Sequence, residues 1–403
     1  MRVLFADNLS EFAIEHLRAR GIACDVMPWL TADDLPEHIS DYEVLVVRST
    51  GVNATTLEAG SKLDLVVRAG AGTNTIDCVR AAQLGIVVSN VPARNAMAVA
   101  ELTLGLMFAV DRNIANATAD ARSGIWNKKA HGRSRGLYGA TLGILGMGSI
   151  GLEVAKRAIA SGLDVITTAT PAHPPATLQF MKELGIRCTS DLCSLLGASD
   201  IVSLHVPAWP TTVDMVDSYF LASMKTDAIL INTSRGSAVV EADLIAALDS
   251  TEMRAGIDVC NDEPNSSSGE FYSELARHPK VTFTHHIGAS THQAQTAIAK
   301  GTIEVIEKYC RGMLTNCVNL ELSPVRAAVL SITCQDQVRV LALVLQELNN
   351  RSIDIGNMNS QVLAGGKTSI THIDVTGITI SHDEFTNSIL AIPGVLQAKT
   401  QKV

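Results

Sequence analysis

One stretch of the sequence decides the fold: Leu142-Gly143-Ile144-Leu145-Gly146-Met147-Gly148-Ser149-Ile150-Gly151. Its apolar first half is typical of a buried strand, and residues 153–160 continue with the periodicity of an amphipathic helix. At such a junction the free N–H groups of the helix, here those near Ser149 and Ile150, point toward a phosphate. Gly146 permits the tight turn, Gly148 lets a phosphate approach the backbone, and Gly151 lets the helix lie close to the strand. We therefore expect a dinucleotide-binding fold.

The same rhythm of short apolar runs and helical segments extends in both directions. The series that contains the glycine run has strand-like segments at 141–145, 164–168, 201–204, 228–231, 255–259 and 281–284. An earlier series has them at 3–5, 44–47, 65–67 and 86–89, with helical patterns at 10–20 and about 97–110. This alternation predicts parallel sheets covered by helices. We expect an α/β protein with two doubly wound, Rossmann-like sheets.

The pattern changes beyond Pro324 to a small α+β unit. Its expected order is strand 327–334, helix 338–349, strand 353–359, strand 368–375, helix 383–391 and strand 395–402. This is a βαββαβ order, and the Gly365-Gly366 pair fits a hairpin turn between the middle strands. A helix at 290–311 can return the chain to the first sheet. We therefore predict a discontinuous substrate-binding domain (1–93 and 286–316), a dinucleotide-binding domain (94–285) and a regulatory or assembly domain (326–403).

Composition argues against several other functions. A formal net charge of -9 opposes broad binding to nucleic acid or anionic membranes, because those partners reward basic surfaces. No apolar run approaches the roughly 20 residues of a membrane-spanning helix, and the N-terminus lacks the apolar core of a signal peptide. The eight cysteines are scattered without CxxC pairs. We expect free thiols, no metal site and a cytoplasmic protein.

The choice between the two nicotinamide dinucleotides depends on the residue that closes the next strand. An acid there would bind the ribose 2′-hydroxyl of NAD. This strand instead ends in Thr167-Thr168-Ala169-Thr170-Pro171. Thr170 has no charge to repel a 2′-phosphate, and no arginine follows closely to bind one. We expect NAD as the cofactor, and NADP is not excluded.

Eight ordered motifs carry a family resemblance over nearly all of residues 1–325. Besides the glycine run they are RST (48–50), VRAGAGTN (67–74), NAMAVAE (95–101), SLHVP (203–207), INTSRG (231–236), DVCNDEP (258–264) and HIGAS (286–290). In this order they resemble the D-2-hydroxyacid dehydrogenases. The resemblance implies hydride transfer between carbon 2 of a hydroxy acid and a nicotinamide cofactor.

The resemblance assigns catalysis to Arg235, Glu263 and His286, and the chemistry suits these residue types. His286 can take the proton of the alcohol as hydride leaves, and return it in the reverse direction. Glu263 would bond the far ring nitrogen, fix the tautomer and favour the protonated imidazole. Arg235 offers a planar, two-pronged donor to the substrate carboxylate. The family more often has proline in place of His285, and alignment on Ile287-Gly288-Ala289 selects His286 as the catalytic histidine.

The resemblance also implies which residues hold the ligands. For the dinucleotide they are Gly146, Gly148, Ser149, Ile150, Gly151, Thr170, His205, Val206, Pro207, Thr233, Ser234, Asp258, His286 and Gly288. For the substrate they are Arg48, Ser49, Ala71, Gly72, Asn95, Lys128, Arg235 and His286. Among these, Asp258 is expected to support the site structurally.

Within the family, the chain most resembles the members that oxidise D-3-phosphoglycerate to 3-phosphohydroxypyruvate, the first step of L-serine biosynthesis. Arg48-Ser49 and Asn95 match the phosphate contacts of those members. Residues 124–129 (GIWNKK) resemble a segment whose tryptophan inserts into the neighbouring subunit. The C-terminal unit looks like their ACT-type domain. The resemblance thus implies a phosphorylated hydroxy acid as substrate and a homo-oligomer, a dimer or tetramer, with Trp126 at a subunit contact.

Alternatives stay open at this point. A glyoxylate, hydroxypyruvate or other 2-oxoacid reductase would share the catalytic trio without needing phosphate contacts. A protein of another class, an NAD(H)-sensing binding protein, would use the fold without the chemistry. The ACT-type unit also departs from its pattern, because Arg339 replaces a glycine and Asp336 and Asp354 stand where serine-inhibited relatives have asparagine. We therefore favour assembly over serine feedback for this domain.

Overall fold

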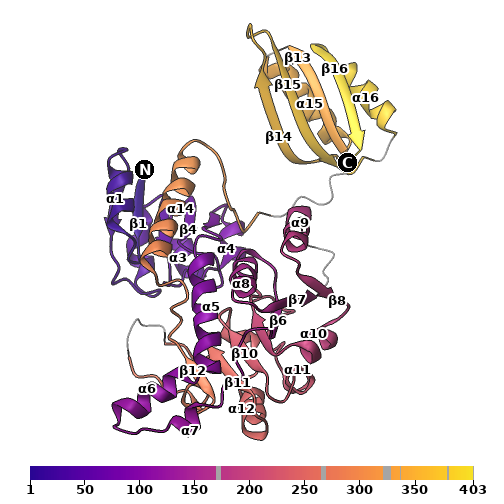
Figure 1. The fold of residues 1–403 in the computed structure, drawn as a ribbon. Helices are drawn as coiled ribbons and strands as arrows, with labels where there is room; N and C mark the ends of the chain where they lie inside the picture. Colours follow the sequence, from indigo (N-terminus) through magenta and orange to yellow (C-terminus); the bar gives the residue numbers. More distant parts are fainter. Residues whose placement is uncertain (169–173, 265–268, 321–327, 336, 379–380, 403) are drawn as a thin grey trace. The chain divides into compact units, whose positions relative to one another are not determined.

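The computed structural model describes residues 1–168, 174–264, 269–320, 328–335, 337–378 and 381–402. The chain divides into two units, Met1–Asn319 and Leu320–Val403. The first unit contains two parallel sheets and the second contains one antiparallel sheet (Figure 1). The predicted fold class, two Rossmann-like sheets and a βαββαβ unit, is confirmed.

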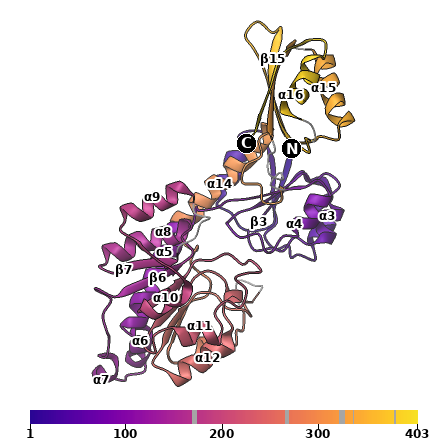
Figure 2. The same cartoon turned by 90° about the vertical axis from the view of Figure 1, so that its right-hand side faces the viewer.

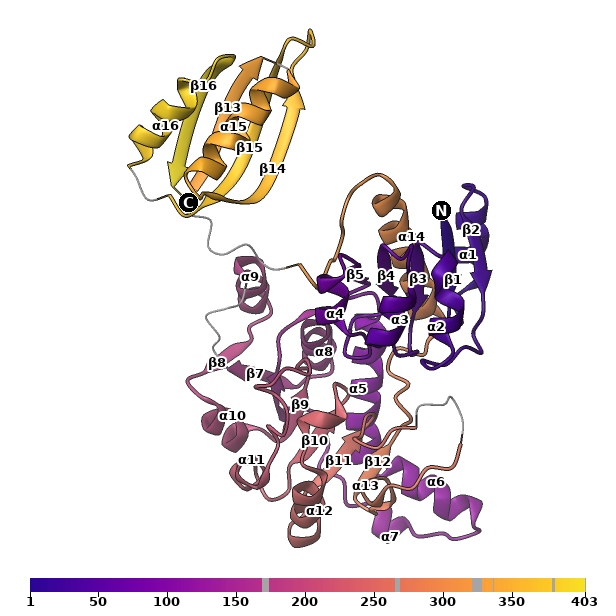
Figure 3. The same ribbon diagram turned by 180° about the vertical axis from the view of Figure 1, so that it is seen from behind.

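The first sheet has five parallel strands in the order β2-β1-β3-β4-β5. They are β1 (Arg2–Phe5), β2 (Ala23–Val26), β3 (Val44–Val47), β4 (Leu65–Arg68) and β5 (Val87–Asn90). One face is covered by α1 (Glu11–Arg18) and α14 (His292–Cys310), and the other by α2 (Leu35–His38), η1 (Ile39–Asp41), α3 (Ala54–Ala59) and α4 (Cys78–Gln83) (Figure 3). Every residue of β3 is buried, as expected for a strand covered on both faces.

The second sheet has seven parallel strands in the order β12-β11-β10-β9-β6-β7-β8. They are β6 (Thr141–Leu145), β7 (Asp164–Thr168), β8 (Arg187–Thr189), β9 (Ile201–Leu204), β10 (Ile229–Asn232), β11 (Arg254–Ile257) and β12 (Val281–Phe283). One face packs against α5 (Ala96–Asp111), α8 (Ser149–Ala160) and α9 (Pro175–Glu183) (Figure 2). The other packs against α10 (Leu192–Ala198), α11 (Ser218–Ser223), α12 (Glu241–Ser250) and α13 (Glu274–Arg277). A 3-10 turn, η2 (Gly236–Ala238), follows β10.

Two edge strands are absent from the sequence-based prediction, which gave four strands for the first sheet and six for the second. β2 has the sequence ACDV, and only Cys24 is fully buried. β8 has the sequence RCT and no buried residue. A strand at a sheet edge needs little apolar sequence, because only one neighbour and part of each face cover it. Neither segment therefore has the apolar run on which the prediction depends.

Two helices precede the first strand of the second sheet, α6 (Ile114–Arg122) and α7 (Lys128–His131). They connect α5 to β6, and neither contains a buried residue. Helices in proteins gain most of their stability by packing an apolar face. Within the described part of one chain, these two helices lack that cover.

The second unit is a four-stranded antiparallel sheet with one helix-covered face. Its order is β14 (Asp354–Val362), β15 (Thr368–Thr376), β13 (Ala328–Gln335) and β16 (Val395–Lys402). The helices α15 (Val338–Asn350) and α16 (His382–Leu390) pack on it through Val344 and Phe385. Gly365 and Gly366 have φ of 104° and 67° in the predicted hairpin turn. Asp336 lies outside the described residues.

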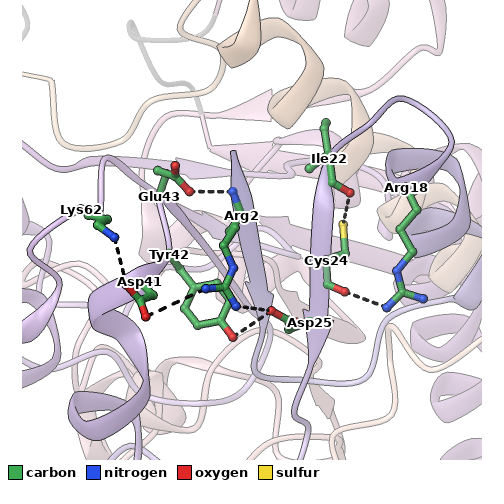
Figure 4. Close-up of polar contacts among 9 residues, drawn as sticks. All are labelled: Arg2, Arg18, Ile22, Cys24, Asp25, Asp41, Tyr42, Glu43 and Lys62. Atoms are coloured by element: carbon green, nitrogen blue, oxygen red, sulfur yellow. Dashed lines mark hydrogen bonds and ion pairs between the residues drawn. The ribbon is translucent and has the colours of Figure 1, made fainter.

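The amino ends of the first sheet carry a network of paired charges (Figure 4). Arg2 Nη2 lies 3.0 Å from Asp25 Oδ2, which also accepts a 3.0 Å hydrogen bond from the Tyr42 hydroxyl. The Arg2 guanidinium lies 4.7 Å from the centroid of the Tyr42 ring. Lys62 Nζ lies 2.9 Å from Asp41 Oδ1. Opposite charges thus meet within the fold at this end of the sheet.

Candidate active site

The predicted catalytic and substrate residues gather where the parallel strands end. Arg48 follows β3, and Arg68 is the last residue of β4. In the second sheet, Asp258 follows β11, while Arg235 and His286 lie shortly after β10 and β12. Ligands of open α/β sheets bind at this edge.

His286 and Glu263 form a close pair. His286 Nδ1 lies 2.6 Å from Glu263 Oε2, and the His286 side chain is 52% exposed. Burial by itself would raise the pKa of Glu263, but its hydrogen bonds with His286 and the Cys260 amide, together with the charge of Arg235, lower it overall. An ionised Glu263 accepts the Nδ1 proton, which leaves Nε2 of the neutral ring with a free lone pair. Nε2 has no hydrogen-bond partner among the described residues.

Asp258 holds the turn that delivers His286. Its side chain is buried and accepts hydrogen bonds from Thr284 Oγ1 at 2.6 Å, from the Ile287 amide at 2.9 Å and from the Gly288 amide at 3.0 Å. Its backbone carbonyl accepts the His286 amide at 2.7 Å. His286 has a φ of 51°, in the left-handed region that non-glycine residues rarely adopt. This hydrogen bonding fixes the backbone on both sides of the strained residue.

Arg235 extends from the second sheet to the first. Its Nη1 donates a 2.6 Å hydrogen bond to the carbonyl of Ser234. A side chain at Gly72 would collide with Nη2 of Arg235, so this glycine makes room for the guanidinium. Asn232 stabilises the segment by accepting from the Ser234 amide at 3.0 Å and donating to the Arg235 carbonyl at 2.8 Å. Burial lowers the pKa of Arg235, and the negative charge of Glu263 offsets only part of this shift.

Two more arginines extend from the carboxyl ends of β3 and β4. Arg48 Nη1 donates to Gln295 Oε1 at 2.8 Å, and burial lowers its pKa despite the nearby Asp7. Arg68 has a buried Nε without a hydrogen-bond partner among the described residues. Burial, followed by the charges of Arg235 and Arg48, lowers the pKa of Arg68 to about 10. The three guanidinium groups therefore concentrate positive charge at one edge.

The glycine run has the geometry of a dinucleotide cradle. Gly146 has a φ of 98°, and a side chain there would collide with the carbonyl of His205. A side chain at Gly151 would collide with the Gly146 carbonyl, whereas the space in front of Gly148 is open. Helix α8 begins at Ser149, with Ile150 next, so its free N–H groups face that open space. The residues present therefore fit the pyrophosphate of a dinucleotide.

His205 borders this cradle. Its Nε2 lies 2.9 Å from Ser203 Oγ, and its buried Nδ1 has no partner among the described residues. Burial lowers its pKa from 6.5 to about 3, so the ring is neutral at physiological pH. Val206 and Pro207 continue the loop after it. Thr233 directly follows β10, and its Oγ1 lies 2.8 Å from Oγ1 of Thr103 in helix α5. Thr170 lies outside the described residues.

The structure brings only some predicted substrate residues into hydrogen-bonded contact. The Ser49 amide donates to Asp7 at 3.1 Å, and the Ala71 carbonyl accepts from Asn90 at 2.7 Å. Two other predicted substrate residues, Asn95 and Lys128, make no side-chain hydrogen bond or ion pair with a described residue. Trp126, the predicted subunit contact, is 88% exposed.

Sequence reasoning missed three polar residues of this edge. Arg68 stands inside one of the quoted motifs, and a basic residue that closes an apolar run was the available signal. Asp7 also follows an apolar run directly, and its Oδ2 accepts from the amides of Arg48, Ser49 and Thr50. Gln295 comes from α14, about 250 positions away from Arg48, and has no sequence signal.

Known proteins match both the fold and the sequence. The pattern of the D-isomer specific 2-hydroxyacid dehydrogenase, NAD binding domain, matches residues 104–288. A hydroxypyruvate reductase of Thermotoga maritima is 41% identical over 281 residues, which are 69% of this chain and 87% of the relative. The chain belongs to the D-isomer specific 2-hydroxyacid dehydrogenases.

Two further comparisons extend over more of the dehydrogenase. A D-3-phosphoglycerate dehydrogenase of Methanocaldococcus jannaschii is 38% identical over 329 residues, which are 80% of this chain and 60% of the relative. The dehydrogenase thus spans about 60% of that curated relative's length. The TT0316 protein from Thermus thermophilus is 31% identical, and its structure gives a TM-score of 0.69 over 79% of this chain and 100% of its own.

Other classes of site are not found in the described part of the dehydrogenase. No described helix has the length and apolar character that a membrane span requires. The described residues contain no group of three or more His, Cys, Asp or Glu side chains that could hold a metal ion. All eight cysteines have free thiols.

Proposed function

We propose that this dehydrogenase oxidises D-3-phosphoglycerate to 3-phosphohydroxypyruvate, reversibly, with a nicotinamide dinucleotide, in the first step of L-serine biosynthesis. One observation carries the proposal: Arg48, Arg68 and Arg235 have no carboxylate at salt-bridge distance among the described residues. Three desolvated guanidinium groups favour a ligand with two anionic groups. Phosphoglycerate has a carboxylate and a phosphate, and the curated relative from Methanocaldococcus jannaschii supports this substrate.

The arginines divide between the two anionic groups in this proposal. Arg235, which lies over Gly72 and near Glu263, binds the carboxylate together with the backbone of Ala71 and Gly72. Arg48 and Arg68 come from neighbouring strands and bind the phosphate. Ser49 and Asn95 add polar contacts to the phosphate. Binding a ligand with two anionic groups offsets the cost of burying three like charges together.

The chemistry follows from the Glu263–His286 pair. Nε2 of His286 accepts the proton of the substrate 2-hydroxyl, while Glu263 stabilises the imidazolium through Nδ1. Arg235 orients the substrate and polarises the reacting oxygen. A nicotinamide dinucleotide held by Gly146, Gly148 and Gly151 would supply the acceptor for the hydride of carbon 2. In the reverse direction, His286 returns the proton to the reduced carbonyl.

NAD is the proposed cofactor, and NADP is not excluded. Thr170 supplies neither the carboxylate that binds a ribose 2′-hydroxyl nor a cation for a 2′-phosphate. The family's NAD-binding domain supports NAD. Fluorescence titration of the protein with NADH and NADPH measures the preference directly. Tighter binding of NADPH by tenfold or more would replace this assignment.

A homo-oligomer, a dimer or tetramer, completes the proposal. Neither α6 nor α7 has a buried residue, and Trp126 between them is 88% exposed. A second copy of the chain would cover these helices, with Trp126 as an aromatic anchor and Lys128 directed at the neighbour's anion site. Sedimentation of Trp126→Ala should show a smaller assembly than the parent protein. An unchanged sedimentation coefficient contradicts the subunit contact.

The remaining assignments follow the same logic. We assign residues 1–93 and 286–316 to substrate binding, 94–285 to the dinucleotide and 326–403 to an ACT-type assembly domain in a cytoplasmic enzyme. All nine residues of β14 are exposed at a sheet edge, which favours pairing with another chain. Removal of residues 326–403 should reduce the assembly size and leave turnover intact.

Steady-state rates test the substrate. We expect kcat/KM with 3-phosphohydroxypyruvate to exceed that with hydroxypyruvate or glyoxylate. A preference for an unphosphorylated acid would contradict the proposal and favour a 2-oxoacid reductase, the activity for which the Thermotoga maritima relative is named. Turnover that survives His286→Ala unchanged would exclude the mechanism. A complete lack of turnover with every acid would favour an NAD(H)-sensing binding protein.

A further inference from the structure

Three aromatic rings, one of them from the residue directly before His286, have no part in the chemistry above. Phe271 and Phe283 stack, with centroids 5.6 Å apart and planes at 27°. His285 meets both rings edge-on, at 5.8 Å and 90° to Phe283 and at 6.5 Å and 64° to Phe271. Aromatic pairs prefer these offset and edge-to-face arrangements. We call Phe271, Phe283 and His285 the ring cluster.

The ring cluster joins the end of β12, which leads to His286, to Phe271 in the connection before α13. Glu263 lies after β11, and Phe271 follows in the same connection, just before α13. Phe283 ends β12, and His285 directly precedes His286. Stacking of Phe271 on Phe283 therefore anchors the strand end that leads to His286. Phe283 also packs against the core of the second sheet, which gives the cluster a rigid base.

The catalytic pair needs such a constraint. His286 is held in its left-handed conformation, with a φ of 51°, by hydrogen bonds to Asp258. Glu263 is held by the Cys260 amide, which donates to Oε1 at 3.1 Å within the same connection. These hydrogen bonds hold His286 and Glu263 separately, and none of them sets the position of one side chain relative to the other. The ring cluster anchors the residue directly before His286, and the separation of 2.6 Å between His286 Nδ1 and Glu263 Oε2 is sensitive to where the His286 ring lies.

His285 contributes to the ring cluster through aromatic contacts and not through an ion pair. It has no carboxylate at salt-bridge distance and no hydrogen bond from its side chain among the described residues. Its contacts are with two phenyl rings. We infer that the ring cluster is a positioning device that holds His286 against Glu263, in which His285 acts through its aromatic ring; the catalytic purpose of the device rests on the proposed function.

Nitrogen-15 NMR of the full chain labelled at histidine tests this inference without a substrate. The imidazole shifts of His286, assigned with His286→Gln, report whether Nδ1 carries the proton bonded to Glu263. We expect this signature in the parent protein and in His285→Phe. Phe271→Ala and His285→Ala should lose it, and kcat should fall at least about tenfold, part of the full contribution of acid–base catalysis. The KM for the dinucleotide should stay unchanged.

Tyr272 provides a matched control in the same connection. Its ring is 76% exposed and lies 4.2 Å from the Arg277 guanidinium, outside the ring cluster. Tyr272→Ala should preserve both the Nδ1 signature and kcat. If Phe271→Ala does not fold, Phe271→Leu should still weaken the signature, because a leucine cannot stack on Phe283.

Two results would overturn the inference. One is an intact Nδ1 signature in the Phe271 variants and in His285→Ala. The other is its loss in His285→Phe, which would assign His285 a polar role. A failure of the proposed function would give a different result. The Nδ1 signature would still be lost in Phe271→Ala and His285→Ala, but the parent protein would not turn over 3-phosphoglycerate.

Discussion

The two ends of the five-stranded sheet treat their charges in opposite ways. At the amino ends, Arg2 and Lys62 of Figure 4 face carboxylates, as Arg2 faces Asp25 at 3.0 Å. At the carboxyl ends, Arg48, Arg68 and Arg235 lack a carboxylate at salt-bridge distance among the described residues, and burial lowers the pKa of each. Burying unpaired charge costs free energy. The ion pairs at the amino ends therefore stabilise the fold. The arginines without a carboxylate partner at the carboxyl ends indicate a binding site for an anion.

The largest expected effect comes from removing Arg235. Arg235→Leu should lower kcat/KM by about 100- to 1000-fold, since a charged donor aimed at the reacting substrate is lost. The free energy of unfolding should stay equal or rise, because a buried cation near two others disappears. Steady-state kinetics and urea unfolding measure both quantities. A loss of stability as large as the loss of transition-state binding would mean that Arg235 is structural.

Arg68 separates ligand binding from stability. Its pKa of about 10, lowered by burial and by Arg235 and Arg48, means that the fold disfavours its charged form. At pH 7 Arg68→Met should therefore unfold at an equal or higher temperature. Inorganic phosphate should raise the melting temperature of the parent protein by binding the native state, and lose this effect in Arg68→Met. Arg2→Met, at the paired end, is the control that should keep the phosphate response.

The Glu263–His286 pair predicts a pH dependence of stability. Burial would raise the pKa of Glu263, but the hydrogen bonds with His286 and Cys260 and the charge of Arg235 lower it below 4.5. A carboxyl with a lowered folded pKa stabilises the fold above its unfolded value, and this contribution is lost as the pH falls through the folded value. Glu263→Gln should cost at most about 1 kcal/mol at pH 7 and less at pH 4. Urea unfolding that shows the larger cost at pH 4 contradicts this sign.

The smallest effect belongs to the amino ends. Asp25→Asn should lower the free energy of unfolding by about 0.5 kcal/mol, because the Arg2–Asp25 pair is exposed. The difference should shrink in about 1 M salt, where surface charges are screened. kcat/KM should not change. A drop in kcat/KM would show that the paired end contributes to the site.

The sequence contains the order of elements but only part of the site. The glycine run at Gly146 and the alternation around it predict the parallel sheets, because local periodicity follows burial. β2 and β8 escape prediction because edge strands need little apolar sequence. Gln295 escapes it for another reason: its role depends on a contact with the distant Arg48, which leaves no local pattern.

One measurement tests the central claim most directly: the ratio of kcat/KM for 3-phosphohydroxypyruvate to that for hydroxypyruvate, in the parent protein and in Arg48→Met/Arg68→Met. Hydrogen bonds to charged groups contribute about 1.5–3 kcal/mol each. The unpaired arginines therefore predict a ratio of roughly 100 or more in the parent protein and a ratio close to 1 in the double variant. A parent ratio below 1, or a ratio that the double substitution leaves unchanged, would contradict the claim that these arginines await a phosphorylated substrate.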